Sequence, residues 1–141
     1  MSETVPSALR LRGAPAIFSY GSLQQEAVQV SLYGRASPGE SDELLDCVLT
    51  LIEIPKSHKA AGSGLTHYKN VEVSPGSGSR VSGTVFEVTT RELAMTDVYE
   101  QESDYVRVSV VLASGRSAWV YVSARTAPDF GCAAADASAR K

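Results

Sequence analysis

The chain has 141 residues, of which 43% are hydrophobic and 21% are charged. That length suits one domain with one hydrophobic core, and that composition excludes disorder over most of the chain. The net charge of −3 is small and the basic residues are scattered, so neither nucleic acid nor an anionic membrane is an expected partner. With no recognisable secretory signal and no apolar run near the ~20 residues of a membrane-spanning helix, the expected location is the cytoplasm.

One folded domain is expected over residues 15–123, between two segments of weak pattern. Residues 1–14 are polar and predict a loose N-terminal arm. Residues 124–141 are rich in Ala and small polar side chains and predict a C-terminal tail. Phe130 is the large apolar residue of this tail and is able to dock it onto the domain.

The first part of the domain predicts two strands and a short helix. Residues 16–20 form an apolar strand that runs into Tyr20-Gly21-Ser22-Leu23, which is either an ordinary turn or a backbone freed to hold a ligand. Residues 24–33 favour a short helix or turn ended by Gly34. Residues 44–53 predict one strand with a shared apolar face made of Leu45, Cys47, Leu49 and Leu51.

A second strand pair is expected after a polar loop over residues 56–66. The runs 68–73 and 81–88 predict strands, and the Ser/Pro/Gly segment 74–79 between them is a turn. Gly83 lies inside the second run, where a glycine indicates a bulge or a close approach of another backbone.

The last part predicts a helix followed by a hairpin. Thr89 and Glu92 have the spacing of a capping box, which opens a helix over residues 90–99. The runs 105–112 and 117–123 are joined by a short turn and predict a β-hairpin. Short antiparallel strands with one or two helices indicate an α+β fold, whose sheet must close or be covered to hide its edges.

The sequence gives no sign of a metal or nucleotide site. Cys47 and Cys132 have no metal-ligand spacing, and His58 and His67 lie near a polar loop without further ligands. Two isolated cysteines are more often free thiols in a reducing cytosol, although the sequence leaves a disulfide between them open. Neither a Walker pattern nor a dinucleotide glycine pattern occurs.

Glu100 is the residue that most clearly breaks a local rule. It falls at the C-terminal end of the predicted helix, where the helix dipole disfavours a carboxylate, and it shares a face with Asp97. Such violations are expected where function lies, and a glutamate with a raised pKa suits a general base or acid near neutral pH. The alternative is a solvated acidic turn, which composition alone favours.

The chain resembles the gamma-glutamylcyclotransferase-like family, in particular its AIG2-like branch, over about residues 15–123. The resemblance rests on an ordered set of motifs, each weak by itself: Tyr20-Gly21-Ser22-Leu23, Gly34-Arg35, Gly83-Thr84-Val85-Phe86-Glu87, Asp97-Val98-Tyr99-Glu100, Tyr105-Val106-Arg107 and Ala118-Trp119-Val120-Tyr121-Val122. It implies a small, closed, mostly antiparallel β-barrel with one or two flanking helices.

The resemblance also implies an activity and its substrates. In this family the free α-amine of a γ-glutamyl amide or dipeptide attacks the side-chain amide carbonyl and releases 5-oxoproline and an amine, with no cofactor or metal. The alternative is a non-catalytic small-molecule-binding or regulatory module that uses the same carboxylate-binding cleft. The physiological leaving group and the oligomeric state are left open.

Carried onto this sequence, the family's catalytic glutamate falls on Glu100. Its substrate-binding loop, which acts through backbone N–H groups, falls on Tyr20, Gly21, Ser22 and Leu23, and Tyr105 is expected to orient the substrate. Arg107 is expected to pair with Asp97 or with Glu100. Many family members have Gly directly after the glutamate, whereas this chain has Gln101.

Overall fold

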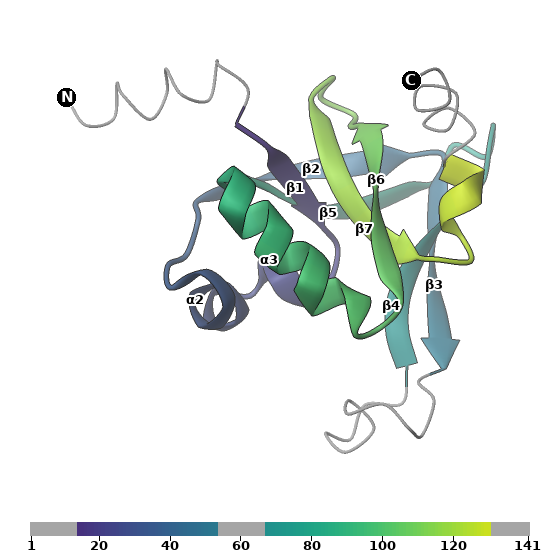
Figure 1. Cartoon of the computed structure of the whole chain (residues 1–141). Helices are drawn as coiled ribbons and strands as arrows, with labels where there is room; N and C mark the ends of the chain where they lie inside the picture. The colour runs from purple at the N-terminus through teal and green to yellow at the C-terminus, as the bar shows by residue number, and fades with distance from the viewer. Residues whose placement is uncertain (1–13, 54–66, 131–141) are drawn as a thin grey trace, which may run out of the picture.

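The computed structural model describes residues 14–53 and 67–130. Nearly all of the expected N-terminal arm, the loop with His58, and the end of the tail with Cys132 lie outside the described residues. Figure 1 shows the described residues as a sheet with helices α2 and α3 beside it. The part of the tail up to Phe130 packs against the core, as the sequence suggested for that residue.

A five-stranded sheet with the order β2-β5-β1-β7-β6 forms the centre of the molecule. All of its neighbouring strands run antiparallel except β1 and β7, which are parallel. Its strands are β1 Ala16–Ser19, β2 Gly39–Leu45, β5 Arg80–Glu87, β6 Tyr105–Val111 and β7 Ser117–Ser123.

Strand β1 lies in the middle of this sheet and is buried along its whole length. Successive side chains of a strand point to opposite faces. Ile17 accordingly joins a hydrophobic cluster with Leu93 of the helix that follows β5, and Phe18 joins a second cluster with Val71. Both faces of the sheet are therefore covered, which is why this strand reads as continuously apolar.

A separate antiparallel pair contains β3 Cys47–Glu53 and β4 His67–Val73. The prediction of one strand over residues 44–53 is wrong, because the backbone of Asp46 adopts a left-handed conformation with φ 56 and divides the run between β2 and β3. The expected apolar face is not found either: of its four side chains Cys47 is buried, whereas Leu45, Leu49 and Leu51 are 45%, 49% and 65% exposed.

The helices whose two ends are described are η1 Ser22–Gln24, α2 Glu26–Tyr33 and α3 Thr90–Gln101, and residues 127–130 are also helical. These helices, together with a sheet that contains both parallel and antiparallel strand pairs, confirm the α+β class. Neither sheet closes on itself among the described residues, so the closed barrel is not confirmed. None of the helices found in residues 14–53 and 67–130 is long and apolar enough to cross a membrane.

The capping box at the start of α3 is present as predicted. The Glu92 amide donates to Thr89 Oγ1 at 3.0 Å, and the Thr89 amide donates to Glu92 Oε1 at 2.9 Å. The Glu92 carboxylate also receives two hydrogen bonds from the Arg35 guanidinium, at 2.8 and 2.6 Å. A cap of this kind contributes about 1 kcal/mol. The start of α3 is thus fixed to the chain just after α2.

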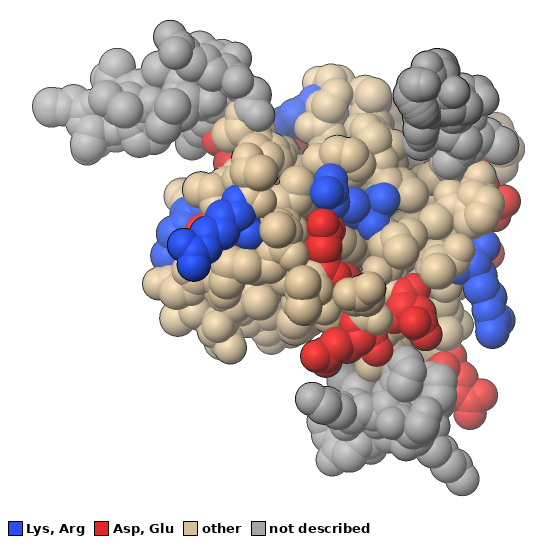
Figure 2. All heavy atoms as spheres, in the orientation of Figure 1, with Lys and Arg blue, Asp and Glu red and all other residues tan. Residues whose placement is uncertain are grey.

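Figure 2 shows how charge is distributed over one face of the molecule. Lys and Arg lie in small separate groups on this face, and acidic side chains gather near its lower part, where α3 ends in Figure 1. This face carries no basic stripe of the kind that follows a nucleic-acid backbone.

Candidate functional site

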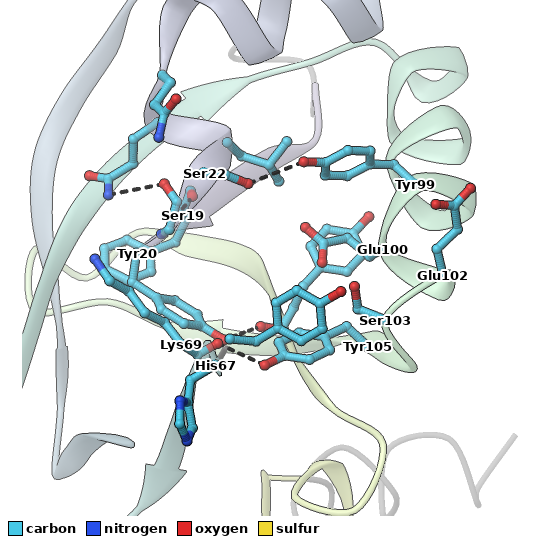
Figure 3. A pocket seen from close by; sticks show the side chains of 17 residues that line it. Ser19, Tyr20, Ser22, His67, Lys69, Tyr99, Glu100, Glu102, Ser103 and Tyr105 are labelled. Atoms are coloured by element: carbon cyan, nitrogen blue, oxygen red, sulfur yellow. Dashed lines mark hydrogen bonds between the residues drawn. The ribbon is translucent and has the colours of Figure 1, made fainter. Parts of the chain in front are cut away.

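A cavity of about 880 Å³ lies where the end of β1, the η1 turn, the start of β4 and the end of α3 meet. Five tyrosines line it, together with Glu100, Glu102 and polar residues of the loop after β1. Figure 3 shows Ser22 and Tyr99 at one end of this cavity, Glu100 in the middle, and Tyr105 near Lys69 and His67 at the other end.

The loop after β1 provides two backbone N–H donors at the cavity, those of Ser22 and Leu23. The Gly21 amide donates to Ser19 Oγ at 3.2 Å, and the amides of Gln24 and Gln25 donate to carbonyl groups at the start of the turn. Within the described part of the chain, neither the Ser22 amide nor the Leu23 amide donates a hydrogen bond. The first amides of a helical turn have no partner inside the turn, so they are available to an anion.

A glycine on the neighbouring strand allows this loop to sit where it does. A Cβ atom on Gly83 of β5 would collide with the Ser19 carbonyl oxygen and would stand 2.7 Å from Cζ of Phe18. The close backbone approach expected at Gly83 is therefore confirmed, and it brings β5 against the strand that carries the loop.

Glu100 lies in the last turn of α3 and its carboxyl faces the cavity (Figure 3). Burial raises the pKa of Glu100 from 4.5 to about 7, because the charged form is poorly solvated there. No hydrogen bond or ion pair of its carboxylate is found among the described residues. At neutral pH this group is therefore able both to accept and to donate a proton.

The tyrosine hydroxyls around Glu100 are mostly engaged with the protein. Tyr20 donates to the Tyr121 carbonyl at 2.6 Å and Tyr105 donates to the Lys69 carbonyl at 2.7 Å. The hydroxyls of Ser22 and Tyr99 lie 3.2 Å apart and join the loop to α3. Burial, reinforced by the negative charge of Glu100, raises the pKa of Tyr20 and of Tyr105, so both hydroxyls stay protonated.

Asp97 and Arg107 form an ion pair behind the cavity. Arg107 Nε lies 2.8 Å from Asp97 Oδ1, and the same oxygen accepts a hydrogen bond from the Tyr121 hydroxyl at 2.7 Å. The Arg107 guanidinium also lies 4.3 Å from the centre of the Trp119 ring. Of the two partners expected for Arg107, the structure has Asp97 and not Glu100. Through Tyr121, which lines the cavity, this pair links α3 to β6 and β7.

The structure brings the predicted site residues to one cavity: Tyr20, Gly21, Ser22, Leu23, Glu100 and Tyr105. Sequence reasoning missed Tyr68, Tyr121, Glu102 and Ser103. His67 is exposed and also borders the cavity. No local signal marks Tyr68, because β4 pairs only with β3 and reaches the cavity through tertiary packing. Among the described residues, no group of three or more His, Cys, Asp or Glu could hold a metal ion.

Solved structures with similar folds include a protein from Arabidopsis thaliana with 23% identity and a TM-score of 0.59. They also include an uncharacterized human protein with 20% identity and a TM-score of 0.62, and a gamma-glutamyl cyclotransferase with 18% identity and a TM-score of 0.60. These alignments cover 80%, 78% and 78% of this chain, and 64%, 66% and 66% of the others, so the chain spans about two thirds of their length.

At these identities the likeness shows the fold alone. A comparison with curated proteins found no match. The family model described as gamma-glutamyl cyclotransferase, AIG2-like, matches residues 17–136. That match covers most of the sequence and includes the whole cavity described above. The chain belongs to the gamma-glutamyl cyclotransferase, AIG2-like family.

Proposed function

We propose that this chain is a cyclotransferase that converts a γ-glutamyl amide or dipeptide into 5-oxoproline and a free amine. The observation that carries the proposal is the Glu100 carboxyl, which lines the cavity with a pKa of about 7 and has no partner among the described residues. A carboxylate that the fold does not use for its own stability is free to serve a substrate.

The reaction makes one bond and breaks another. The α-amine of the γ-glutamyl group attacks its own side-chain carbonyl, the new C–N bond closes the five-membered ring, and the original amide C–N bond breaks. An α-ammonium is not a nucleophile, so Glu100 takes one of its protons first and later gives that proton to the leaving nitrogen. The ring nitrogen loses its second proton to solvent as the lactam forms, and one carboxyl with a pKa near neutrality suffices for both transfers through Glu100.

The amides of Ser22 and Leu23 are proposed to hold the α-carboxylate or the oxyanion that develops on the attacked carbonyl. Both amides belong to residues that line the cavity, and among the described residues other than its two chain neighbours nothing lies within 4 Å of where a Cβ on Gly21 would stand. Packing therefore leaves room for a ligand beside this backbone. Tyr105 is proposed to orient the substrate with its ring, because its hydroxyl is bound to Lys69.

The test is mass-spectrometric detection of 5-oxoproline after incubation of the protein with a panel of γ-glutamyl amides and dipeptides. The wild type is expected to form product and Glu100→Gln is not, whereas Glu26→Gln removes an exposed carboxylate of α2 that does not line the cavity and serves as the control. Product from Glu100→Gln at the wild-type rate would overturn the role of Glu100.

Binding without product would favour the alternative, a small-molecule-binding or regulatory module with the same cavity. Calorimetric titration with 5-oxoproline and with the γ-glutamyl panel separates these outcomes. A catalyst forms product from at least one amide that it binds. A binding module gives heat of binding and leaves every amide intact.

A further inference from the structure

The γ-glutamyl group of the proposed reaction occupies only one end of the cavity. Glu100 must reach both the attacking amine and the leaving nitrogen, so the two parts of the substrate lie on either side of its carboxyl. With the loop of Ser22 at one end, the leaving group points to the end with Tyr105 (Figure 3). This inference rests on the proposed function.

The cavity is large for a γ-glutamyl group alone. Its 880 Å³ falls within the roughly 300–1,000 Å³ of pockets that enclose drug-sized ligands. A substantial leaving group therefore fits at the Tyr105 end, and the residues at that end decide which leaving groups bind well.

Two aromatic rings form a corner at this end. The rings of Tyr68 and Tyr105 meet edge to face, with centroids 6.0 Å apart and an angle of 80° between their planes. Tyr105 is buried and fixed through its hydroxyl on the Lys69 carbonyl. Tyr68 is half-buried, and its hydroxyl has no hydrogen bond within the described part of the chain. A third ring can stack on or abut such a corner in the geometries that aromatic pairs prefer.

Charged side chains of both signs border the cavity. Lys69 and His67 line it beside Tyr68, and Glu102 lines it from the end of α3. Figure 3 shows the His67 ring directed away from Glu100. These charges select neither for nor against a carboxylate on the leaving group, so the two rings are the feature that distinguishes one leaving group from another.

We propose that the leaving group is an amine that carries an aromatic ring, and that Tyr68 determines this specificity. The ring of the leaving group packs in the corner of Tyr68 and Tyr105 while its nitrogen takes a proton from Glu100. No part of the family resemblance involves Tyr68.

The experiment compares two substrates of similar size, the γ-glutamyl amides of phenethylamine and of 2-cyclohexylethylamine. The first differs from the second only in the aromaticity of its ring. The wild type is expected to favour the phenethyl amide over the cyclohexyl amide by about two- to tenfold in kcat/KM, measured as 5-oxoproline.

Two variants of Tyr68 test the assignment to this residue. Tyr68→Phe keeps the ring and is expected to keep the preference for the phenethyl amide. Tyr68→Leu keeps an apolar side chain without a ring and is expected to bring the ratio of the two rates close to one. The ratio compares two substrates on one variant, so it does not depend on how much folded protein each preparation contains.

Equal rates for the aromatic and saturated amides in the wild type, or an unchanged ratio in Tyr68→Leu, would overturn the inference and leave the proposed function standing. Calorimetric titration of Glu100→Gln with the same two amides measures the preference without turnover. If no amide yields 5-oxoproline, the proposed function fails, and the ratio of the two affinities still decides whether the aromatic corner exists as a binding site.

Discussion

Replacing Glu100 by Gln is expected to stabilise the protein at neutral and alkaline pH. The fold holds this carboxyl where its charged form is poorly solvated, and its pKa is raised from 4.5 to about 7. An unfolded chain gives up that proton readily as the pH rises past 4.5, whereas the folded chain keeps it until about pH 7. The wild type therefore loses stability as the pH rises between these two values. The Glu100→Gln variant has no ionisable group at this position and keeps that stability.

The size of the effect follows from the same two pKa values. Each pKa unit corresponds to 1.36 kcal/mol, so a rise from 4.5 to about 7 corresponds to about 3 kcal/mol. Glu100 is partly exposed and solvent reduces this figure, so about 3 kcal/mol is the upper end of the expected gain. Below pH 4.5 the carboxyl is protonated in both states and the gain from this source vanishes.

Urea denaturation of the wild type and Glu100→Gln from pH 4 to pH 8.5 measures the difference in the free energy of unfolding. The difference is expected to grow between about pH 4.5 and pH 7 and to stay level above it. Glu102→Gln removes an exposed carboxylate two residues away and is expected to change stability by less than about 0.5 kcal/mol. A difference for Glu100→Gln that does not vary with pH would refute the argument from desolvation.

Three other predictions concern the reaction and its framework. The kcat/KM of the wild type is expected to rise with pH through a limb near 7, where Glu100 of the free enzyme loses its proton, and a profile flat from pH 5.5 to 8 would contradict this assignment. Gly83→Ala is expected to lower the free energy of unfolding by about 1–3 kcal/mol in urea denaturation, because the added methyl group collides with backbone; unchanged stability would contradict that collision. Asp97→Ala is expected to cost about 1–3 kcal/mol by leaving Arg107 and the Tyr121 hydroxyl unpaired, and thermal unfolding compared with Asp97→Asn, which keeps an acceptor oxygen, checks whether that hydrogen bond is responsible.

The elements that could be predicted from the sequence are those specified by neighbouring residues. Thr89 and Glu92 satisfy the first amides of α3 by themselves, so the spacing of two residues located the start of the helix. The strands β6 and β7 are joined by a short turn and pair with each other along their whole length. In both cases the interacting residues lie close together in the sequence, so the local pattern was enough to predict the element.

The elements that could not be predicted depend on distant partners. The largely polar strand β2 is exposed or half-exposed except at Leu44, which is buried, and it becomes a strand because β5 pairs with it. The left-handed turn at Asp46 is held by Ser79, whose carbonyl accepts its amide at 2.8 Å. Tyr68 reaches the cavity only because β4 packs near Tyr105, far along the chain. Glu100, by contrast, was detectable because its conflict with the helix dipole is local.

The pairing of β1 has a consequence for the order of events on the ribosome. One edge of β1 pairs with β5 and the other with β7, and the Tyr20 hydroxyl bonds to a carbonyl 101 residues further along the chain. A nascent chain that has not yet emerged as far as residue 117 leaves one edge of an apolar strand without its neighbour. The loop and Glu100 therefore acquire their final wall only after β7 has emerged, and the exposed strand is the segment that a chaperone would be expected to shield until then.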